Sequence, residues 1–245
     1  MLILSNWKTY VTNKDDAKKL FAATKRVATT SKAKLVVLPP HPYIGLFHSP
    51  RAAKVLLGAQ DVSTTIAGAA TGEVPAGVLK NLGVTYVLAG HSERRAKGED
   101  NEVVAEKVRR ILEQSMTPVL CVGEKERDED ANYLAFLTEQ ITSVFDALDQ
   151  KERFNVMIAY EPIWAIGKEA QDALHSQELA EMVLYIKKIL TKYMPTKQTT
   201  KILYGGSVEP DNIRGLAGGS GVDGFLVGHA SADPEMFSRL IKALQ

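Results

Sequence analysis

The feature that most constrains the fold is a regular alternation of short apolar runs with longer amphipathic ones along all 245 residues. Eight runs are rich in Val, Ile and Leu and mostly unalternating, as expected for strands covered on both faces of a parallel sheet. We predict strands at Leu2–Asn6, Lys34–Leu38, Val55–Gln60, Val84–Ala89, Pro118–Val122, Asn155–Tyr160, Lys201–Tyr204 and Gly224–Val227.

Helical patterns lie between these runs, with apolar residues recurring at three- and four-residue spacing. The four longest are Asp15–Thr29, Glu99–Gln114, Asn132–Leu148 and Ser176–Tyr193. Shorter helices are predicted at Tyr43–Ala53, Val74–Leu82, Pro210–Leu216 and Pro234–Leu244. Eight strand-then-helix units without a dividing linker favour one closed (β/α)8 barrel, an α/β TIM-barrel domain over residues 1–245, rather than two domains. Asn6–Lys8 after the first strand is not the glycine-rich turn of a dinucleotide-binding open sheet.

Composition narrows the possible partners. A formal net charge of +1 gives no general electrostatic reason to expect nucleic acid or an anionic membrane. The single cysteine, Cys121, rules out an intramolecular disulfide and a cysteine-based zinc site. No window approaches 18 consecutive apolar residues, and the first residues lack the pattern of a signal peptide. We therefore expect a cytoplasmic protein with a small-molecule partner.

Polar residues gather where the predicted strands end. In parallel barrels the carboxyl ends of the strands carry the chemistry. These positions hold Asn6 and Lys8 (first strand), His91, Ser92 and Glu93 (fourth), Glu161 (sixth), Gly205-Gly206-Ser207 (seventh) and Gly228-His229 (eighth).

Each of these residues has an ordinary interpretation when taken alone. Lys8 fits a solvated loop lysine, and His91 fits a hydrogen-bonded structural histidine. Glu161 fits a cap of the turn or the ion-pair partner of Arg94 or Arg95. Their convergence on one face of one barrel favours a functional site instead.

The glycine-rich turns indicate where a ligand's anionic end would lie. Loops after the seventh and eighth barrel strands commonly bind phosphate through backbone N–H groups and a helix N-terminus. Gly205-Gly206 also fits a plain turn, with Ser207 as the N-cap of the next helix. Lys8 would supply a compact positive charge. The five histidines lack metal-ligand spacing, so we expect no metal and either proton transfer or a lysine Schiff base, which the early position of Lys8 disfavours.

Eight short motifs carry a resemblance to a known family. They are N-W-K (Asn6–Lys8), G-A-Q (Gly58–Gln60), T-G-E-V (Thr71–Val74), G-H-S-E-R-R (Gly90–Arg95), C-V-G-E (Cys121–Glu124), A-Y-E-P-I-W-A-I-G (Ala159–Gly167), Y-G-G-S-V (Tyr204–Val208) and G-F-L-V-G (Gly224–Gly228). In these motifs, their order and their spacing, the chain resembles the triosephosphate isomerase family over essentially its full length.

The resemblance implies interconversion of dihydroxyacetone phosphate and glyceraldehyde 3-phosphate, a step of glycolysis and gluconeogenesis, without a cofactor. It implies that Glu161 is the catalytic base and that His91 polarises the carbonyl group. Asn6 and Lys8 match residues that hold the substrate and stabilise developing charge, and Glu93 matches a carboxylate that interacts with the lysine.

The resemblance also assigns the phosphate site and a lid. The positions that match the phosphate site are Gly167, Ser207, Leu226, Gly228 and His229. The lid would be Pro162, Ile163, Trp164, Ala165, Ile166 and Gly167. Its apolar side chains would keep water from a charged intermediate. A loop packed permanently on the barrel is the alternative.

The chain departs from the family pattern in three places. Lys168-Glu169 stand where a Thr-Gly hinge is usual, so the lid kinetics are expected to differ. His229 replaces the second glycine after the eighth strand, and its side chain would restrict the approach of a phosphate. Thr9-Tyr10 replace the more common Met-Asn.

The resemblance further implies a homodimer, with the loop Asp61–Glu73 of one subunit meeting the stretch after Lys8 of the other. Two alternative functions remain open. One is another phosphosugar-processing barrel enzyme with the same phosphate grip. The other is a non-catalytic phosphate-ligand binder whose lid or grip has decayed at Lys168-Glu169 or His229.

Overall fold

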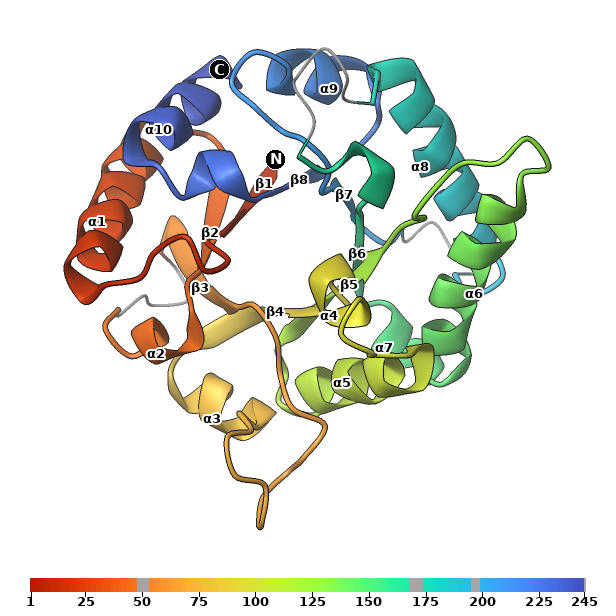
Figure 1. The fold of residues 1–245 in the computed structure, drawn as a ribbon, viewed down its shortest axis with the longest axis horizontal. Coiled ribbons are helices and arrows are strands. Elements are labelled where there is room, and N and C mark those ends of the chain that lie inside the picture. Colours follow the sequence, from red (N-terminus) through yellow and green to blue (C-terminus); the bar gives the residue numbers. More distant parts are fainter. Residues whose placement is uncertain (48–52, 168–173, 195–198, 245) are drawn as a thin grey trace.

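The core of the protein is a closed barrel of eight parallel strands that follow one another in sequence order (Figure 1). The computed structural model describes residues 1–47, 53–167, 174–194 and 199–244. The strands are β1 (Leu2–Asn6), β2 (Lys34–Leu38), β3 (Val55–Ala59), β4 (Val84–Ala89), β5 (Thr117–Val122), β6 (Met157–Tyr160), β7 (Ile202–Tyr204) and β8 (Gly224–Val227). Leu2 of β1 pairs with both Lys34 of β2 and Gly224 of β8, which closes the sheet. The predicted (β/α)8 barrel is confirmed.

Helices form a ring around the barrel, except for the short α4, which lies inside the ring in this view (Figure 1). They are α1 (Lys14–Thr30), α2 (His41–Ile44), α3 (Ala76–Asn81), α4 (Ser92–Arg95), α5 (Asn101–Glu113), α6 (Asn132–Asp146), α7 (Gln150–Arg153), α8 (Ser176–Leu190), α9 (Ile213–Gly219) and α10 (Pro234–Ala243). Two 3₁₀ turns, η1 (Ile163–Ala165) and η3 (His229–Ser231), follow β6 and β8.

Both faces of the strands are buried, which explains the unalternating apolar runs. Successive side chains of a strand point to opposite faces. Ile3 and Leu35 therefore join the layer between barrel and helices, whereas Leu4 and Val36 fill the barrel interior. All four side chains are fully buried, so the scaffold beneath the strand ends is rigidly packed.

Several predicted helix ends were wrong. The helix expected at Tyr43–Ala53 starts at His41 and ends at Ile44, and residues 48–52 of that range lie outside the described part of the chain. The helix α5 starts at Asn101 rather than Glu99, because the Asp100 side chain accepts a hydrogen bond from the N–H of Val103 and caps it.

The region between β7 and β8 also differs from prediction. The helix expected at Pro210–Leu216 is α9, which begins at Ile213 after Asn212. Ser207 is therefore not the N-cap of that helix. The expected strand Asn155–Tyr160 begins only at Met157, because the chain leaves the short helix α7 just before it.

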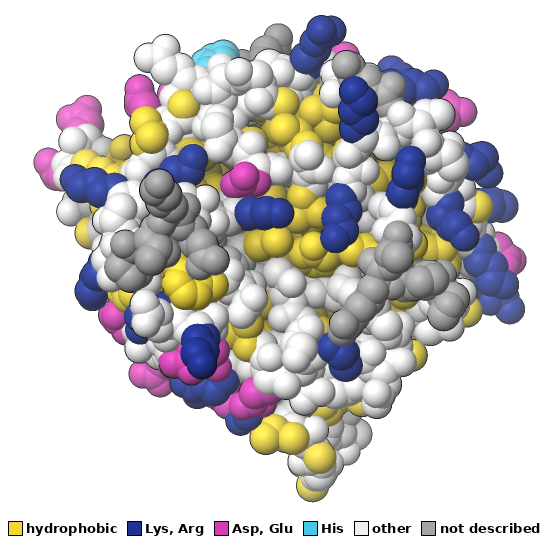
Figure 2. Space-filling model, turned by 180° about the vertical axis from the view of Figure 1, so that it is seen from behind, with side chains coloured by type: hydrophobic (Ala, Val, Ile, Leu, Met, Phe, Trp, Pro, Cys, Tyr) yellow, Lys and Arg dark blue, Asp and Glu magenta, His cyan; other side chains and the backbone are white. Residues whose placement is uncertain are grey.

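Figure 2 shows the face of the molecule that is turned away from the viewer in Figure 1. Lys and Arg side chains surround apolar atoms there, and histidine is visible only at the upper edge. No helix in the described ranges is long and apolar enough to span a membrane.

Candidate active site

A cavity of about 320 Å³ lies at the carboxyl end of the barrel and collects most of the predicted site residues. Predicted residues that line it are Asn6, Lys8, His91, Glu161, Ile166, Gly167, Ser207, Leu226, Gly228 and His229. Glu93 lines the neighbouring cavity instead. Pro162, Ile163, Trp164 and Ala165 line neither of these two cavities.

Lys8 is held in an unusual backbone conformation. Its φ of 44° lies in the left-handed region, which is rare for residues other than glycine. Two hydrogen bonds fix it: the Lys8 N–H donates to Asn6 Oδ1 at 3.0 Å, and the Gln60 amide donates to the Lys8 carbonyl at 3.0 Å. The chain immediately after β1 is thereby aimed into the cavity rather than left as a loose loop.

The ammonium of Lys8 contacts a carboxylate. Its Nζ lies 2.8 Å from Glu93 Oε1, and only 19% of the lysine side chain is exposed. Burial would raise the pKa of Glu93, but the hydrogen bond and positive charge of Lys8 lower that pKa below its usual value. Lys8 is thus not the solvated loop lysine of the ordinary interpretation.

His91 is the N-cap of α4, and its ring is fixed by that position. The backbone N–H of Glu93 donates to His91 Nδ1 at 3.2 Å. This hydrogen bond leaves the proton of the neutral ring on Nε2. Nε2 lies 3.3 Å from Glu161 Oε1, so the imidazole donor and the carboxylate face the same point.

Glu161 follows β6 and is only 3% exposed. Its Oε2 accepts a hydrogen bond from the backbone N–H of Ser92 at 3.3 Å. Neither arginine considered as a partner makes a direct ion pair with Glu161: Arg94 pairs with Asp61 and Glu99, and Arg95 donates to the carbonyl of Gly90. The ion-pair interpretation of Glu161 is therefore wrong.

Gly205 and Gly206 leave room for the side chains of Glu161 and Tyr204. A Cβ on Gly205 would lie 2.8 Å from Glu161 Cγ, and one on Gly206 would lie 2.2 Å from the Tyr204 hydroxyl. Neither glycine has a positive φ, so the need is for space rather than for an unusual turn. The close approach of the β7 turn helps to hold the Glu161 carboxylate in place.

The predicted lid packs on the barrel through Glu124 at the end of β5. Tyr160 OH donates to Glu124 Oε1 at 2.8 Å, and Trp164 Nε1 donates to the same atom at 2.9 Å. Arg127 donates to it at 3.2 Å and lies over the Trp164 ring. Three donors on one buried carboxylate oxygen fix the first half of the segment.

The second half of the segment reaches the turn after β7. The hydroxyl of Ser207 donates to the Ala165 carbonyl at 3.0 Å, which links the lid segment to the candidate phosphate site. Gly167 has a φ of 76° and ends the described part of the segment. The divergent hinge Lys168-Glu169 lies outside the described residues.

The candidate phosphate end also contains residues to which the sequence analysis gave no role in phosphate binding. Glu209 and Tyr10 line the cavity beside Gly228 and His229. Glu124 was noticed only as part of a motif. The position of Glu124 just after a predicted strand could have marked it as a site residue. No neighbouring sequence pattern marks Glu209, because its carboxylate lies beside a residue far away in the chain, His229.

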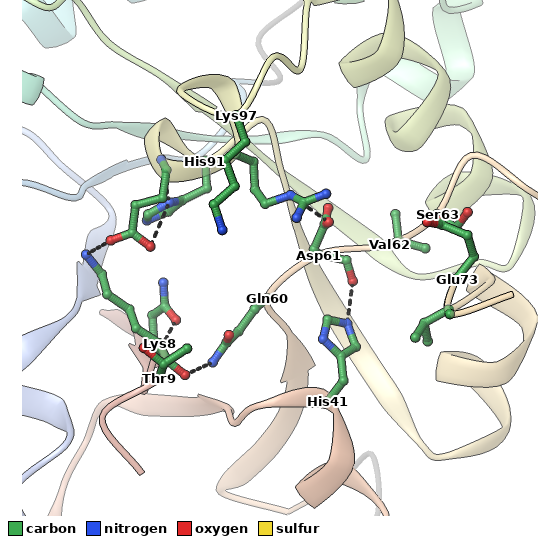
Figure 3. A pocket seen from close by; sticks show the side chains of 15 residues that line it. Lys8, Thr9, His41, Gln60, Asp61, Val62, Ser63, Glu73, His91 and Lys97 are labelled. Carbon is green, nitrogen blue, oxygen red and sulfur yellow. Dashed lines mark hydrogen bonds and ion pairs between the residues drawn. The ribbon is translucent and has the colours of Figure 1, made fainter. Parts of the chain in front are cut away.

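A second cavity of about 340 Å³ adjoins the first (Figure 3). The figure shows the Lys8 amine reaching a carboxylate on one side and His41 bonded to the carbonyl of Asp61 on the other. Residues from both ends of the loop after β3 line this cavity.

Comparison with known proteins identifies the family. The family model described as Triosephosphate isomerase matches residues 1–244. This chain belongs to the triosephosphate isomerase family. A triosephosphate isomerase of Mycoplasmoides gallisepticum is 36% identical over 247 residues, covering 98% of this chain and 97% of the relative. The triosephosphate isomerase of Caldanaerobacter subterraneus is 38% identical, covering 98% of each chain. That of Thermus thermophilus is 37% identical, covering 99% of this chain and 98% of the relative.

Membership of the triosephosphate isomerase family agrees with the resemblance drawn from the eight motifs. The relatives match almost the whole of this chain and are matched over almost their whole length. The chain is therefore an isomerase of this family.

Proposed function

We propose that this triosephosphate isomerase interconverts dihydroxyacetone phosphate and glyceraldehyde 3-phosphate through an enediolate, with Glu161 as the base and His91 as the proton donor to oxygen. The observation that carries these assignments is the 3.3 Å separation of Glu161 Oε1 from His91 Nε2 inside the cavity. A carbon acid and its adjacent carbonyl oxygen can then be contacted at the same time.

In the first step, a Glu161 carboxylate oxygen takes a proton from the carbon beside the substrate carbonyl. The carbon–hydrogen electron pair forms the carbon–carbon double bond of the enediolate, and the carbonyl electrons move to oxygen. A base at this position must be held still, and the Ser92 N–H and the packed Gly205 both restrict Glu161.

The negative charge that develops on oxygen needs donors already aimed at it. His91 Nε2–H and the Lys8 ammonium both line the cavity and supply a hydrogen bond and a positive charge. Proton transfer between the two oxygens gives the alternative enediolate. Glu161 then returns its proton to the other carbon, so the reaction needs neither an oxidant nor a cofactor.

The phosphate group would lie at the opposite end of the cavity. Gly167, Ser207, Leu226, Gly228 and His229 border that end, as the resemblance implies. A Cβ on Gly228 would come within 3.3 Å of Lys8 Cε, so the absence of a side chain there keeps the lysine beside the anion site. Phosphate held here would leave the reacting carbons near Glu161.

We also propose a homodimer formed through the loop Asp61–Glu73. This loop projects from the barrel (Figure 1), and Ile66 near its tip is 67% exposed. An apolar tip on a projecting loop is typical of a segment that inserts into a partner. The cavity of Figure 3 offers a hollow beside Lys8 that such a tip could enter.

The remaining expectations follow from the same features. We infer one domain over residues 1–245, since the first and last strands of the chain pair with each other. We further infer a cytoplasmic location, which suits a chain with a single free cysteine.

Turnover of glyceraldehyde 3-phosphate in a coupled assay tests the reaction, and Glu161→Asp tests the base. Shortening the base by one methylene should reduce turnover strongly, since a positioned general base contributes about 10²–10⁴-fold. Unchanged turnover in Glu161→Asp would refute the assignment of Glu161 as the base. Thermal stabilisation by 2-phosphoglycolate without any turnover would favour a decayed binder.

Sedimentation at low concentration tests the dimer. Ile66→Glu should shift the protein towards monomer. Leu184→Glu is the matched control, because Leu184 on α8 is similarly exposed at 65% but lies outside the projecting loop. Equal sedimentation of both variants and the wild type would exclude the loop tip from the interface.

A further inference from the structure

Three side chains form a cluster at the phosphate end of the cavity that the proton transfers do not use. His229 lies at the start of η3, Glu209 follows β7, and Tyr10 follows β1. The rings of His229 and Tyr10 meet edge to face, with centroids 5.8 Å apart. His229 Nδ1 lies 3.8 Å from Glu209 Oε1, and the histidine side chain is 66% exposed.

The acidic member of this cluster poses an electrostatic problem. A phosphate bound beside Gly228 would lie close to Glu209, and like charges at short distance repel. The Lys8 ammonium is shared with Glu93 and cannot offset both anions alone. Burial raises the pKa of Glu209, and the neighbouring His229 partly opposes that shift. His229 is therefore placed to neutralise the acid at the anion site.

The surroundings of His229 hold its ring where a ligand can reach it. Nδ1 faces Glu209 and the ring lies edge to face with Tyr10, so in the protonated imidazole Nε2–H is left to donate to a ligand. Glu209 is the charged group that faces the ring, Lys8 lines the same cavity, and Asp211 and Arg239 act electrostatically on Glu209. Both Glu209 and Tyr10 come from elements other than η3, so the ring's position is set by three separate loops.

We propose that the imidazole of His229, oriented by Glu209 and Tyr10, is an additional ligand for the substrate's phosphate group. The proposal rests on the proposed function, because it places the phosphate at the same end of the cavity. It differs from a backbone grip in one testable respect. An imidazole can gain a positive charge and a backbone N–H cannot, so a side-chain ligand makes the affinity for a dianion rise as the pH falls.

Inorganic sulfate is the probe, because it stays dianionic across this pH range whereas a phosphate ester titrates within it. Calorimetry with the wild-type protein, at constant ionic strength, should give about two- to fivefold tighter sulfate binding at about pH 6 than at about pH 8. A solvent-exposed ion pair changes binding affinity by about this factor. The measurement does not depend on turnover.

Two substitutions of the same residue separate charge from shape. His229→Gln keeps a polar side chain of similar reach but cannot become charged, so its sulfate affinity should lose the pH dependence. His229→Lys is permanently charged, so it should bind sulfate tightly at both pH values. A pH dependence that persists in His229→Gln would overturn the proposal, as would His229→Lys binding no tighter than His229→Gln at about pH 8.

The outcome can be told apart from failure of the proposed function. Isomerase turnover together with pH-independent sulfate binding removes only the role of the His229 side chain. The expected sulfate behaviour without any isomerase turnover removes the proposed reaction and keeps the anion ligand.

Discussion

Replacing Gly205 with alanine is expected to displace the carboxylate of Glu161 while leaving the barrel folded. The new Cβ would lie 2.8 Å from Glu161 Cγ and 3.3 Å from Oε1. The Gly205 N–H donates to the Tyr160 carbonyl at 2.8 Å, which anchors the turn. The side chain of Glu161 must therefore yield, rather than the backbone of the turn.

The size of the displacement sets the size of the effect. Ordinary contacts begin at 3.4 Å, so Glu161 Cγ has to withdraw by about 0.6 Å. A misplacement of about 1 Å costs about 10²-fold in rate, so we expect kcat to fall by about 10- to 100-fold. Overpacking of this kind costs about 1–3 kcal/mol, which lowers the melting temperature by about 2–4 °C per kcal/mol in a chain of this length.

The coupled assay measures kcat, and thermal unfolding followed by circular dichroism measures stability. Gly215→Ala is the matched control, because Gly215 lies inside α9 and a Cβ there meets nothing within 4 Å. That variant should keep wild-type turnover and gain about 0.5–1 kcal/mol of stability, since alanine is a better helix former than glycine. A Gly205→Ala protein that melts lower but turns over like Gly215→Ala would refute the steric reasoning.

Three further predictions concern buried polar groups. Glu124→Gln should lower both the melting temperature and kcat, because three donors share one oxygen of that carboxylate. Calorimetry and the coupled assay measure the two quantities, and unchanged values of both would contradict the prediction. Lys107→Met should lower the free energy of unfolding by about 3 kcal/mol, because it leaves Asp61 and Glu99 without their buried ammonium, and denaturant titration measures the loss. Burial raises the pKa of the Cys121 thiol, and a nearby carboxylate raises it further, so at about pH 8 the thiol stays protonated and a thiol-specific reagent should label it only after unfolding.

The barrel could be predicted from the sequence because burial on both strand faces leaves a clear apolar signal. Short helices carried no comparable signal, and α4 was missed because its four residues span barely one turn. The helix α7 was missed as well, although a capping box between Asp149 and Glu152 marks its start. The end of α2 at Ile44 was not readable, because the pattern of apolar residues continues past it.

Some residues of the candidate site could likewise be predicted from the sequence, and others could not. Glu161, His91 and Lys8 stand at predicted strand ends, so the topology of the barrel was enough to bring them together. The roles of Gly205 and Glu124 depend on distances between side chains from different strands. Glu209 lies before α9, which begins at Ile213, and its carboxylate lies beside His229. Contacts across loops of this kind have no periodicity that a sequence pattern can display.

At Lys8, selection for stability and selection for activity favour different residues, because the backbone there is left-handed. A left-handed residue other than glycine costs about 1–2 kcal/mol, so glycine at this position would make the fold more durable. The same change would delete the ammonium from the cavity. A library randomised here and screened only by heat should therefore enrich glycine, whereas one screened by growth on a triose-dependent carbon source should retain lysine. The residues found at this position in the two selections would show how much thermal stability the cell gives up for catalytic rate.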